Sequence, residues 1–235
     1  MIEAVVFDLD GVLLDTEELW DEGRRQIAKE RGGRWRDDAQ RAMMGMSSRE
    51  WSRYMHDVLG VPDPPEEISA RVVARLEALY RERLPLIPGA LEAVRRIGEH
   101  WPLAIASSSN RPLIDLFLEL TGTGDHFRAA GTKMSATRSG ADQTLFRATV
   151  SSEEVERGKP APDVYLEAAR RLGVEPASCA AIEDSENGLR SAAAAGMRVV
   201  AIPNRVFPPS DEALSLADAL LGSLDELTPG VIEGL

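Results

Sequence analysis

The sequence IEAVVFDLDGV, residues 2–12, decides the fold of this 235-residue chain. Residues 5–7 form a short apolar run of β-branched and aromatic type, which predicts a buried strand. Asp8 and Asp10 follow, so two carboxylates stand at the carboxyl end of that strand, where open α/β sheets hold their ligands. Because alternate strand residues point to one face, both carboxylates would share a side if the strand geometry continued. Their repulsion favours a divalent cation between them, and hard oxygen ligands suit Mg²⁺.

The composition is that of a soluble globular protein, with 43% hydrophobic and 28% charged residues. The length predicts one large domain, or one domain that carries a smaller insert. The net charge of −12 argues against nucleic acid as a partner. The single cysteine, Cys179, excludes an intramolecular disulfide and suits a reducing compartment. The sequence has no signal-peptide or transmembrane pattern, so we expect a cytoplasmic protein without a membrane partner, as a monomer or weak homodimer.

The stretch from residue 15 to residue 86 carries helical patterns and no strand pattern. Thr16 or Asp15 can cap a first helix, and residues 66–84 show the spacing of an amphipathic helix. This composition differs from the rest of the chain and predicts an inserted helical cap domain over residues 15–86. Because the insert leaves the chain directly after Asp10, the cap should lie above the carboxyl edge of the sheet.

Strand and helix patterns alternate through the remainder of the chain. Short apolar runs predict further strands at residues 103–106, 148–150, 179–182 and 199–202, with a short one at 219–221. The alternation predicts an α/β fold, a Rossmann-like three-layer core with a mostly parallel sheet and right-handed crossovers. We expect residues 1–14 and 87–235 to form this core domain.

Reactive side chains follow four of the predicted strands. They are Asp8 with Asp10, Ser107, Lys159, and Glu183 with Asp184. Each alone has an ordinary explanation as a turn, a loop or a helix cap. In a parallel sheet, however, all these strand ends lie on one edge, so the four pieces should converge on one cleft.

Four segments of the chain resemble motifs of the haloacid dehalogenase superfamily, in particular its helical-cap phosphatases. They are FDLDGVLLDTE at 7–17, IASSSNR at 105–111, GKPAPDVY at 158–165 and IEDSENGLRSAAAAGM at 182–197. The likeness covers nearly the whole chain and is weakest in the cap. It implies the α/β core with its inserted cap, and a Mg²⁺-dependent phosphatase, but it does not specify a substrate.

The resemblance also implies a role for each strand-end residue. Asp8 would attack phosphorus and form an aspartyl-phosphate, while Asp10 would act first as general acid and then as general base. Mg²⁺ would be held by Asp8, by Asp184 and by the backbone carbonyl of Asp10. Glu183 would assist in holding it, directly or through water. Lys159 would offset the charge of Asp8 and of the phosphate.

Further residues are candidates for binding the substrate. They are Ser107, Ser108 and Asn110 after the second predicted strand, and Trp20, Gly45 and Arg49 in the cap. Arg49 could reach a second anionic group or a sugar hydroxyl, and it fits a solvated helix charge equally. Trp20 also fits a place in the core of the cap, as does Trp51.

Three functions remain open. The favoured one is hydrolysis of a small-metabolite phosphate monoester, a sugar or sugar-alcohol phosphate, because the sequence around Trp20 looks like the cap start of family members that act on these. The alternative is a phosphomutase of the β-phosphoglucomutase type, although those enzymes carry a histidine where this chain has Trp20. A non-catalytic phosphate-binding regulator is the third, and it would not need both Asp8 and Asp10. Family members that dehalogenate lack the second aspartate, so Asp10 argues against dehalogenation.

Residues 128–145 are extra relative to the resembling family. The segment is polar and joins a helix to the third predicted strand, which places it at the amino edge of the sheet. We predict an exposed, mobile loop without a catalytic part.

Overall fold

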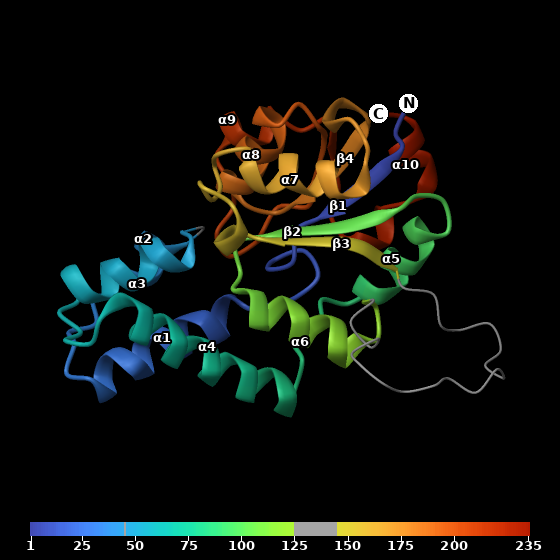
Figure 1. The fold of residues 1–235 in the computed structure, drawn as a ribbon. Helices are drawn as coiled ribbons and strands as arrows, with labels where there is room; N and C mark the ends of the chain where they lie inside the picture. The colour runs from blue at the N-terminus through green and yellow to red at the C-terminus, as the bar shows by residue number, and fades with distance from the viewer. Residues whose placement is uncertain (45, 125–144) are drawn as a thin grey trace, which may run out of the picture.

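A parallel sheet at the centre of the molecule carries the strand ends predicted above (Figure 1). The computed structural model describes residues 1–44, 46–124 and 145–235. The described strands are β1 (Ala4–Phe7), β2 (Leu103–Ser107), β3 (Phe146–Ser151), β4 (Cys179–Glu183), β5 (Arg198–Ala201) and β6 (Ala219–Leu220). They are ordered β3-β2-β1-β4-β5-β6, and every neighbouring pair is parallel. The strand order therefore reverses between β1 and β4, and the predicted α/β fold class is confirmed.

Helices precede and follow these strands along the chain. Between β1 and β2 lie α1 (Glu17–Glu30), α2 (Ala39–Met43), α3 (Ser48–Asp57), α4 (Pro65–Glu82) and α5 (Ala90–Gly98). The later α-helices are α6 (Arg111–Thr121), α7 (Asp163–Leu172), α8 (Glu186–Ala194), α9 (Asp211–Leu214) and α10 (Pro229–Glu233). Short 3₁₀ turns are η2 (Ser152–Glu154), η3 (Pro176–Ser178) and η4 (Leu224–Glu226). None of the described helices is long and apolar enough to cross a membrane.

The two faces of the sheet pack against different helices because strand side chains alternate. Val5 and Phe7 of β1 belong to the cluster that contains residues of α5 and α6. Ala4 and Val6 belong to the cluster that contains residues of α7 and α8. Asp8 comes two residues after Val6, and alternate residues of a strand point to the same face. The side chain of Asp8 is therefore directed to the side of the sheet that α7 and α8 cover.

The helices α1 to α4 form the segment predicted as a cap, and Figure 1 shows them grouped beside the sheet, with α4 packed on α6. The two connections to the core run side by side. Leu14 and Leu86 form an antiparallel bridge, and the amide of Asp15 donates a 2.8 Å hydrogen bond to the carbonyl of Pro85. The chain therefore leaves and re-enters the core at one place.

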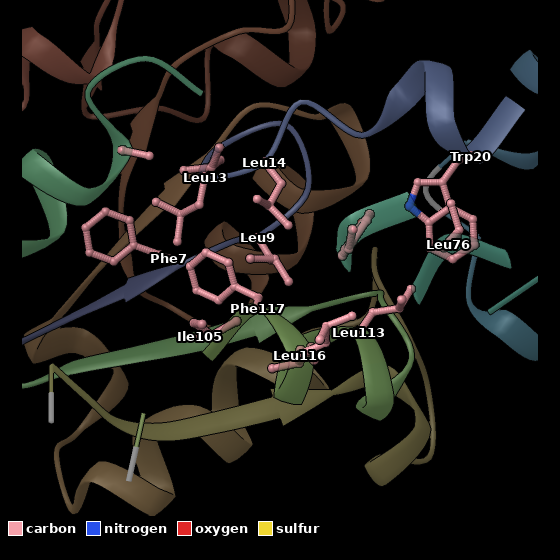
Figure 2. Packing of buried hydrophobic residues seen from close by; sticks show 14 of the residues in the cluster. Phe7, Leu9, Leu13, Leu14, Trp20, Leu76, Ile105, Leu113, Leu116 and Phe117 are labelled. Carbon is pink, nitrogen blue, oxygen red and sulfur yellow. The ribbon is translucent and has the colours of Figure 1, made fainter. Parts of the chain in front are cut away.

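One buried cluster runs from the core into the helices α1 and α4 (Figure 2). It contains Phe7 of β1 and Leu9 just after that strand, Phe117 of α6, and Trp20 and Leu76 of the predicted cap. Because the hydrophobic contact is continuous, the division into a core domain and a cap domain stays a prediction. The predicted loop at 128–145 lies outside the described residues except for its last residue.

Candidate active site

Three carboxylates meet at the carboxyl edge where β1 and β4 lie side by side. Asp8 follows β1, Glu183 ends β4, and Asp184 comes next. One carboxylate oxygen of each residue lies within 4.8 Å of the others, and all three side chains are buried. The strand order reverses at this point, which is where α/β sheets bind their ligands. The structure thus brings together residues that lie far apart in the sequence.

A buried lysine and a buried tyrosine complete the group. Lys159 Nζ lies 3.0 Å from Asp8 Oδ1 and 2.6 Å from Glu183 Oε1. Tyr165 of α7 donates a 2.6 Å hydrogen bond from its hydroxyl to the same Glu183 oxygen. The other oxygen of Glu183 accepts a hydrogen bond from the amide of Asp184 at 3.2 Å. Both oxygens of Glu183 are therefore engaged by donors of the protein.

The charges in this group depend strongly on one another. Burial raises the pKa of Asp8 to about 8; Lys159 opposes that rise and Glu183 adds to it. Burial, with the charge of Glu183, also raises the pKa of Asp184 well above its ordinary range. Burial alone would lower the pKa of Lys159, but the carboxylates of Asp8 and Glu183 outweigh it and raise that pKa. The carboxyl groups of Asp8, Glu183 and Asp184 thus lie around a single ammonium group, that of Lys159. A divalent cation would offset the negative charge that Lys159 leaves uncompensated.

The surroundings of Asp184 fit such a cation. Asp184 Oδ1 is buried and has no hydrogen-bond partner among the described residues, and Oδ2 accepts a long 3.4 Å bond from Asn204. Gly11 makes room for this carboxylate, because a Cβ at residue 11 would lie 2.0 Å from Asp184 Oδ2. The donors of Asp8 and Asp184 are hard carboxylate oxygens. The residues present therefore fit a divalent metal ion.

The second aspartate is turned away from the three carboxylates, toward neutral donors. Asp10 Oδ2 accepts a 2.6 Å hydrogen bond from Ser109 Oγ. Asp10 Oδ1 accepts bonds from Thr16 Oγ1 at 2.7 Å and from Trp20 Nε1 at 3.3 Å. Thr16 is the N-cap of α1, but its hydroxyl makes no capping bond and serves Asp10 instead. The two aspartates of the first motif thus have different environments, and Asp10 is joined to the cap.

A cavity of about 330 Å³ lies between the carboxyl edge of the sheet and the helices α1 and α3. Asp8, Asp10, Lys159 and Asp184 line it at the sheet edge, and Trp20, Arg24 and Trp51 line it from these helices, which belong to the predicted cap. The volume suits a small metabolite. A larger cavity of about 1250 Å³ has none of these residues in its described lining. The smaller cavity is therefore the one that contains the reactive groups.

The predicted phosphate contacts after β2 lie in different settings. Ser108 lines the cavity. Ser107 is fully buried, and its hydroxyl oxygen accepts a 2.9 Å hydrogen bond from the amide of Ser109. Asn110 donates a 2.8 Å hydrogen bond to Glu153. Their predicted role in holding phosphate stays a prediction, and the arrangement shows Ser107 shaping the turn that presents the next two serines.

The predicted cap contacts also differ in their placement. Trp20 is buried and lines the cavity, so both of its predicted roles agree with its position. Trp51 packs edge-to-face on it, with 5.8 Å between the ring centroids. Arg49 is exposed and does not contribute to the described lining of either cavity. Gly45 lies outside the described residues.

Sequence reasoning missed several residues of the site, among them Ser109, Tyr165 and Arg24. Tyr165 is the last residue of the GKPAPDVY segment. Its position in the first turn of the helix after Lys159 could have indicated that its side chain lies near that lysine. Arg24 stands four residues after Trp20, a spacing that puts both side chains on one helix face. Ser109 could not be told from its neighbouring serines, because the turn itself decides which hydroxyl faces Asp10.

Comparison with known proteins agrees with the fold and the site. The family model for haloacid dehalogenase-like hydrolases matches residues 2–196. Hexitol phosphatase B of Escherichia coli K12 is 33% identical over 233 residues, which is 97% of this chain and 95% of that protein. The phosphorylated carbohydrates phosphatase of Thermotoga maritima is 31% identical over 198 residues, 83% of this chain and 82% of that protein.

A solved structure extends the likeness to three dimensions. The crystal structure of CbbY from Rhodobacter sphaeroides in complex with phosphate matches with a TM-score of 0.81 at 28% identity, over 99% of this chain and 100% of that one. The family model spans the reactive strand ends at Asp8 and Glu183 as well as the helices inserted between them. This chain therefore belongs to the haloacid dehalogenase-like hydrolases.

Proposed function

We propose that this chain is a Mg²⁺-dependent phosphatase that hydrolyses a phosphate monoester of a small polyhydroxylated metabolite, a sugar or sugar-alcohol phosphate. The observation that carries the proposal is the contact of Asp8 with Lys159, 3.0 Å apart at one end of the 330 Å³ cavity. The names of the two relatives, which give hexitol and phosphorylated carbohydrates, support the class of ester. The cytoplasmic location and the monomeric or weakly dimeric state stay predictions from the sequence.

Asp8 and Asp184 would hold the cation, with the backbone carbonyl of Asp10 as a further ligand by family resemblance. The bound cation would offset the negative charge of the phosphate and of Asp8. We assign Glu183 mainly to positioning Lys159, because both of its oxygens already accept hydrogen bonds from the protein. Any share of Glu183 in cation binding would then pass through water.

In the first step Asp8 attacks phosphorus. Both bonds to this carboxylate among the described residues go to Oδ1, from the amide of Leu9 at 2.7 Å and from Lys159. Oδ2 is therefore the oxygen that forms the bond to phosphorus, as the bond from phosphorus to the ester oxygen breaks. Asp10 gives its proton to that leaving oxygen, which departs as the alcohol.

In the second step Asp10 accepts a proton from water, and the resulting hydroxide attacks the phosphorus of the aspartyl-phosphate. The bond from Asp8 to phosphorus breaks, so inorganic phosphate leaves and the carboxylate is regenerated. The bonds from Ser109 and Thr16 hold Asp10 in place for both transfers. A general acid or base must stay within hydrogen-bond reach of the proton that it moves.

The test is phosphate release from a panel of sugar phosphates, sugar-alcohol phosphates, phosphoglycolate and nucleotides, each with Mg²⁺ and with a chelator. We expect metal-dependent release that Asp8→Asn reduces at least about 10⁴-fold, because the nucleophile is lost. Asp15→Asn is the matched control, since Asp15 is an exposed carboxylate at the start of the cap. Wild-type release by the Asp8 variant contradicts the proposal. No release from any ester does so too, and directs the next assay to mutase activity with a bisphosphate primer.

A further inference from the structure

The cap end of the cavity contains a buried arginine that the mechanism above does not use. Arg24 on α1 is 6% exposed and lines the cavity. Its guanidinium carbon lies 4.6 Å from the ring centroid of Trp20 and 5.0 Å from that of Trp51. Two aromatic faces therefore hold the cation in place.

This guanidinium makes no direct ion pair in the part of the chain that the structure describes. Its one hydrogen bond there runs from Nη1 to the neutral amide oxygen of Gln40, at a long 3.4 Å. Arg24 Nε is buried without any described partner. Gln40 also donates to the carboxylate of Glu17 at 3.2 Å, so the amide stands between that acid and the arginine. The carboxylates of Glu17, Asp10 and Asp21 favour the charged arginine from a distance, but none of them bonds to it among the described residues. An anion that enters the cavity and bonds directly to the guanidinium would offset more of the cost of its burial.

The two basic residues in the described lining belong to different parts of the fold. Lys159 contacts Asp8 at the carboxyl edge of the sheet, where the ester phosphate would react. Arg24 is on α1 and packs on Trp20, whose indole donates to Asp10 at 3.3 Å. A ligand with its phosphate at Asp8 would therefore point its other end toward the cap arginine. Burial lowers the pKa of Arg24 to about 10, which leaves it charged at neutral pH.

We propose that Arg24 forms a second anion-binding site, and that the preferred substrates carry a carboxylate or a second phosphate at the end remote from the reacting ester. This inference rests on the proposed phosphatase activity. A sugar hydroxyl could also accept a hydrogen bond from Arg24, but it would bring no negative charge into direct contact with the guanidinium. Charge-assisted bonds to a guanidinium are stronger than neutral ones and are often bidentate, so the anion should be selected.

The experiment compares esters that differ only at the remote end. The first pair is sorbitol 6-phosphate and 6-phosphogluconate, which carry an alcohol and a carboxylate at the same carbon. The second pair is ribulose 5-phosphate and ribulose 1,5-bisphosphate, which tests a second phosphate. We expect wild-type kcat/KM to be at least about 10-fold higher for the doubly anionic member of one or both pairs. The pair with the larger ratio identifies the anion.

Arg24→Met should reduce that ratio about 10- to 100-fold, because it removes the charge and keeps most of the volume. Arg25→Met is the matched control on the same helix, since the Arg25 side chain is 60% exposed and pairs with Asp21. The control should keep the wild-type ratio. Equal ratios for Arg24→Met and wild type overturn the inference.

The wild-type ratios need no variant, so the inference can fail even if Arg24→Met does not fold. A ratio at or below one for both pairs overturns it while the phosphatase proposal stands, since all four esters are then still hydrolysed. Hydrolysis of none of the four, and of no other ester in the panel, is instead the failure of the proposed function. The two failures are therefore distinguishable in one assay.

Discussion

The core end and the cap end of the active-site cavity are built in different ways. At the core end, charges contact charges: Lys159 lies within 3.0 Å of two carboxylates, on residues that follow strands of one sheet. At the end lined by α1 and α3, Arg24 lies against two indole rings and bonds to a neutral amide. The register of the sheet fixes the first set, whereas helix packing fixes the second. Under the proposed function, the groups around Asp8 would carry out the reaction and the groups around Arg24 would select the ester.

After the loss of the nucleophile in Asp8→Asn, the largest effect should come from Asp10, which accepts hydrogen bonds from both Ser109 and Trp20. Asp10→Asn keeps the shape but cannot give or take a proton, so kcat for sugar phosphates should fall about 10²- to 10⁴-fold. With p-nitrophenyl phosphate the leaving group needs no acid, but release of phosphate from Asp8 still needs a base. We therefore expect a burst of p-nitrophenol near one equivalent per enzyme, followed by slow turnover, measured by rapid mixing.

Asp15→Asn is the control, and it should show wild-type turnover without a burst. If Asp10→Asn turns over p-nitrophenyl phosphate at the wild-type steady rate, Asp10 is not the base of the second step. The division of labour between the two aspartates would then be wrong.

The core end could be predicted from the sequence because most of its residues stand in a recognisable local sequence pattern. Asp8 and Glu183 follow short apolar runs, and parallel strands bring such ends together without any knowledge of helix packing. Lys159 stands in a distinctive Gly-Lys-Pro loop. The one residue of this group that was overlooked, Tyr165, acts by a single hydroxyl bond to Glu183, which no periodicity reveals.

The cap end could be predicted only in part. Trp20 was a candidate, but the face of α1 that meets the cavity depends on how four helices pack together. Arg24 shares that face, and its position against Trp20 and Trp51 follows from contacts between α1 and α3 rather than from any motif. Gln40 comes from the five-residue helix α2, which has too few residues to show a period. Arg49, the predicted anion contact, is on the exposed side of α3.

The second effect concerns stability in the absence of metal. Asp8 has an ordinary pKa of 3.8 when unfolded and a pKa of about 8 in the fold. Between these values the folded protein keeps a proton that the unfolded chain releases, so the stability that this group contributes is present below the unfolded pKa. It is lost as pH rises toward 8, by on the order of a few kcal/mol. Urea unfolding in chelator, from pH 5 to pH 8, measures this slope.

Asp8→Asn should flatten the slope, because the variant has no proton to lose at this position. Arg24→Met, a change at the cap end, should keep it. Added Mg²⁺ should raise the stability of the wild type most at pH 8, because a cation that binds the folded state stabilises it. Equal slopes for wild type and Asp8→Asn would show that Asp8 does not carry the pH dependence; the pKa of Asp184, which burial also raises, would then be the remaining source.

The third effect compares two glycines with the same backbone conformation. Gly11 has φ +82° and Gly32 has φ +79°, so an alanine is strained at both. A Cβ at residue 11 would also meet Asp184 at 2.0 Å, whereas residue 32 has no atom within 4 Å. Gly11→Ala should therefore weaken apparent Mg²⁺ affinity about 10- to 100-fold, measured by metal titration of activity. Gly32→Ala, in the predicted cap, should cost only about 1 kcal/mol of stability. Similar metal affinity in both variants would argue against Asp184 as a ligand.

The smallest effect should come from Tyr165, whose hydroxyl bonds to Glu183 at 2.6 Å and lies 3.5 Å from Lys159. Tyr165→Phe keeps the ring and removes one of the donors that hold Glu183, so Lys159 should be less firmly placed beside Asp8. We expect kcat to fall about 3- to 10-fold for every ester, a loss near that of one hydrogen bond, with little change in KM.

Tyr54→Phe is the control, since this half-buried tyrosine of α3 makes no hydroxyl bond in the described structure. A merely structural role for Tyr165 would lower the melting temperature and leave kcat unchanged. A positioning role lowers kcat equally for both members of each matched ester pair, because the remote end of the ester does not contact Glu183. If Tyr165→Phe instead changes the ratio between pair members, the core end also takes part in choosing the substrate, and the contrast between the two ends of the cavity fails.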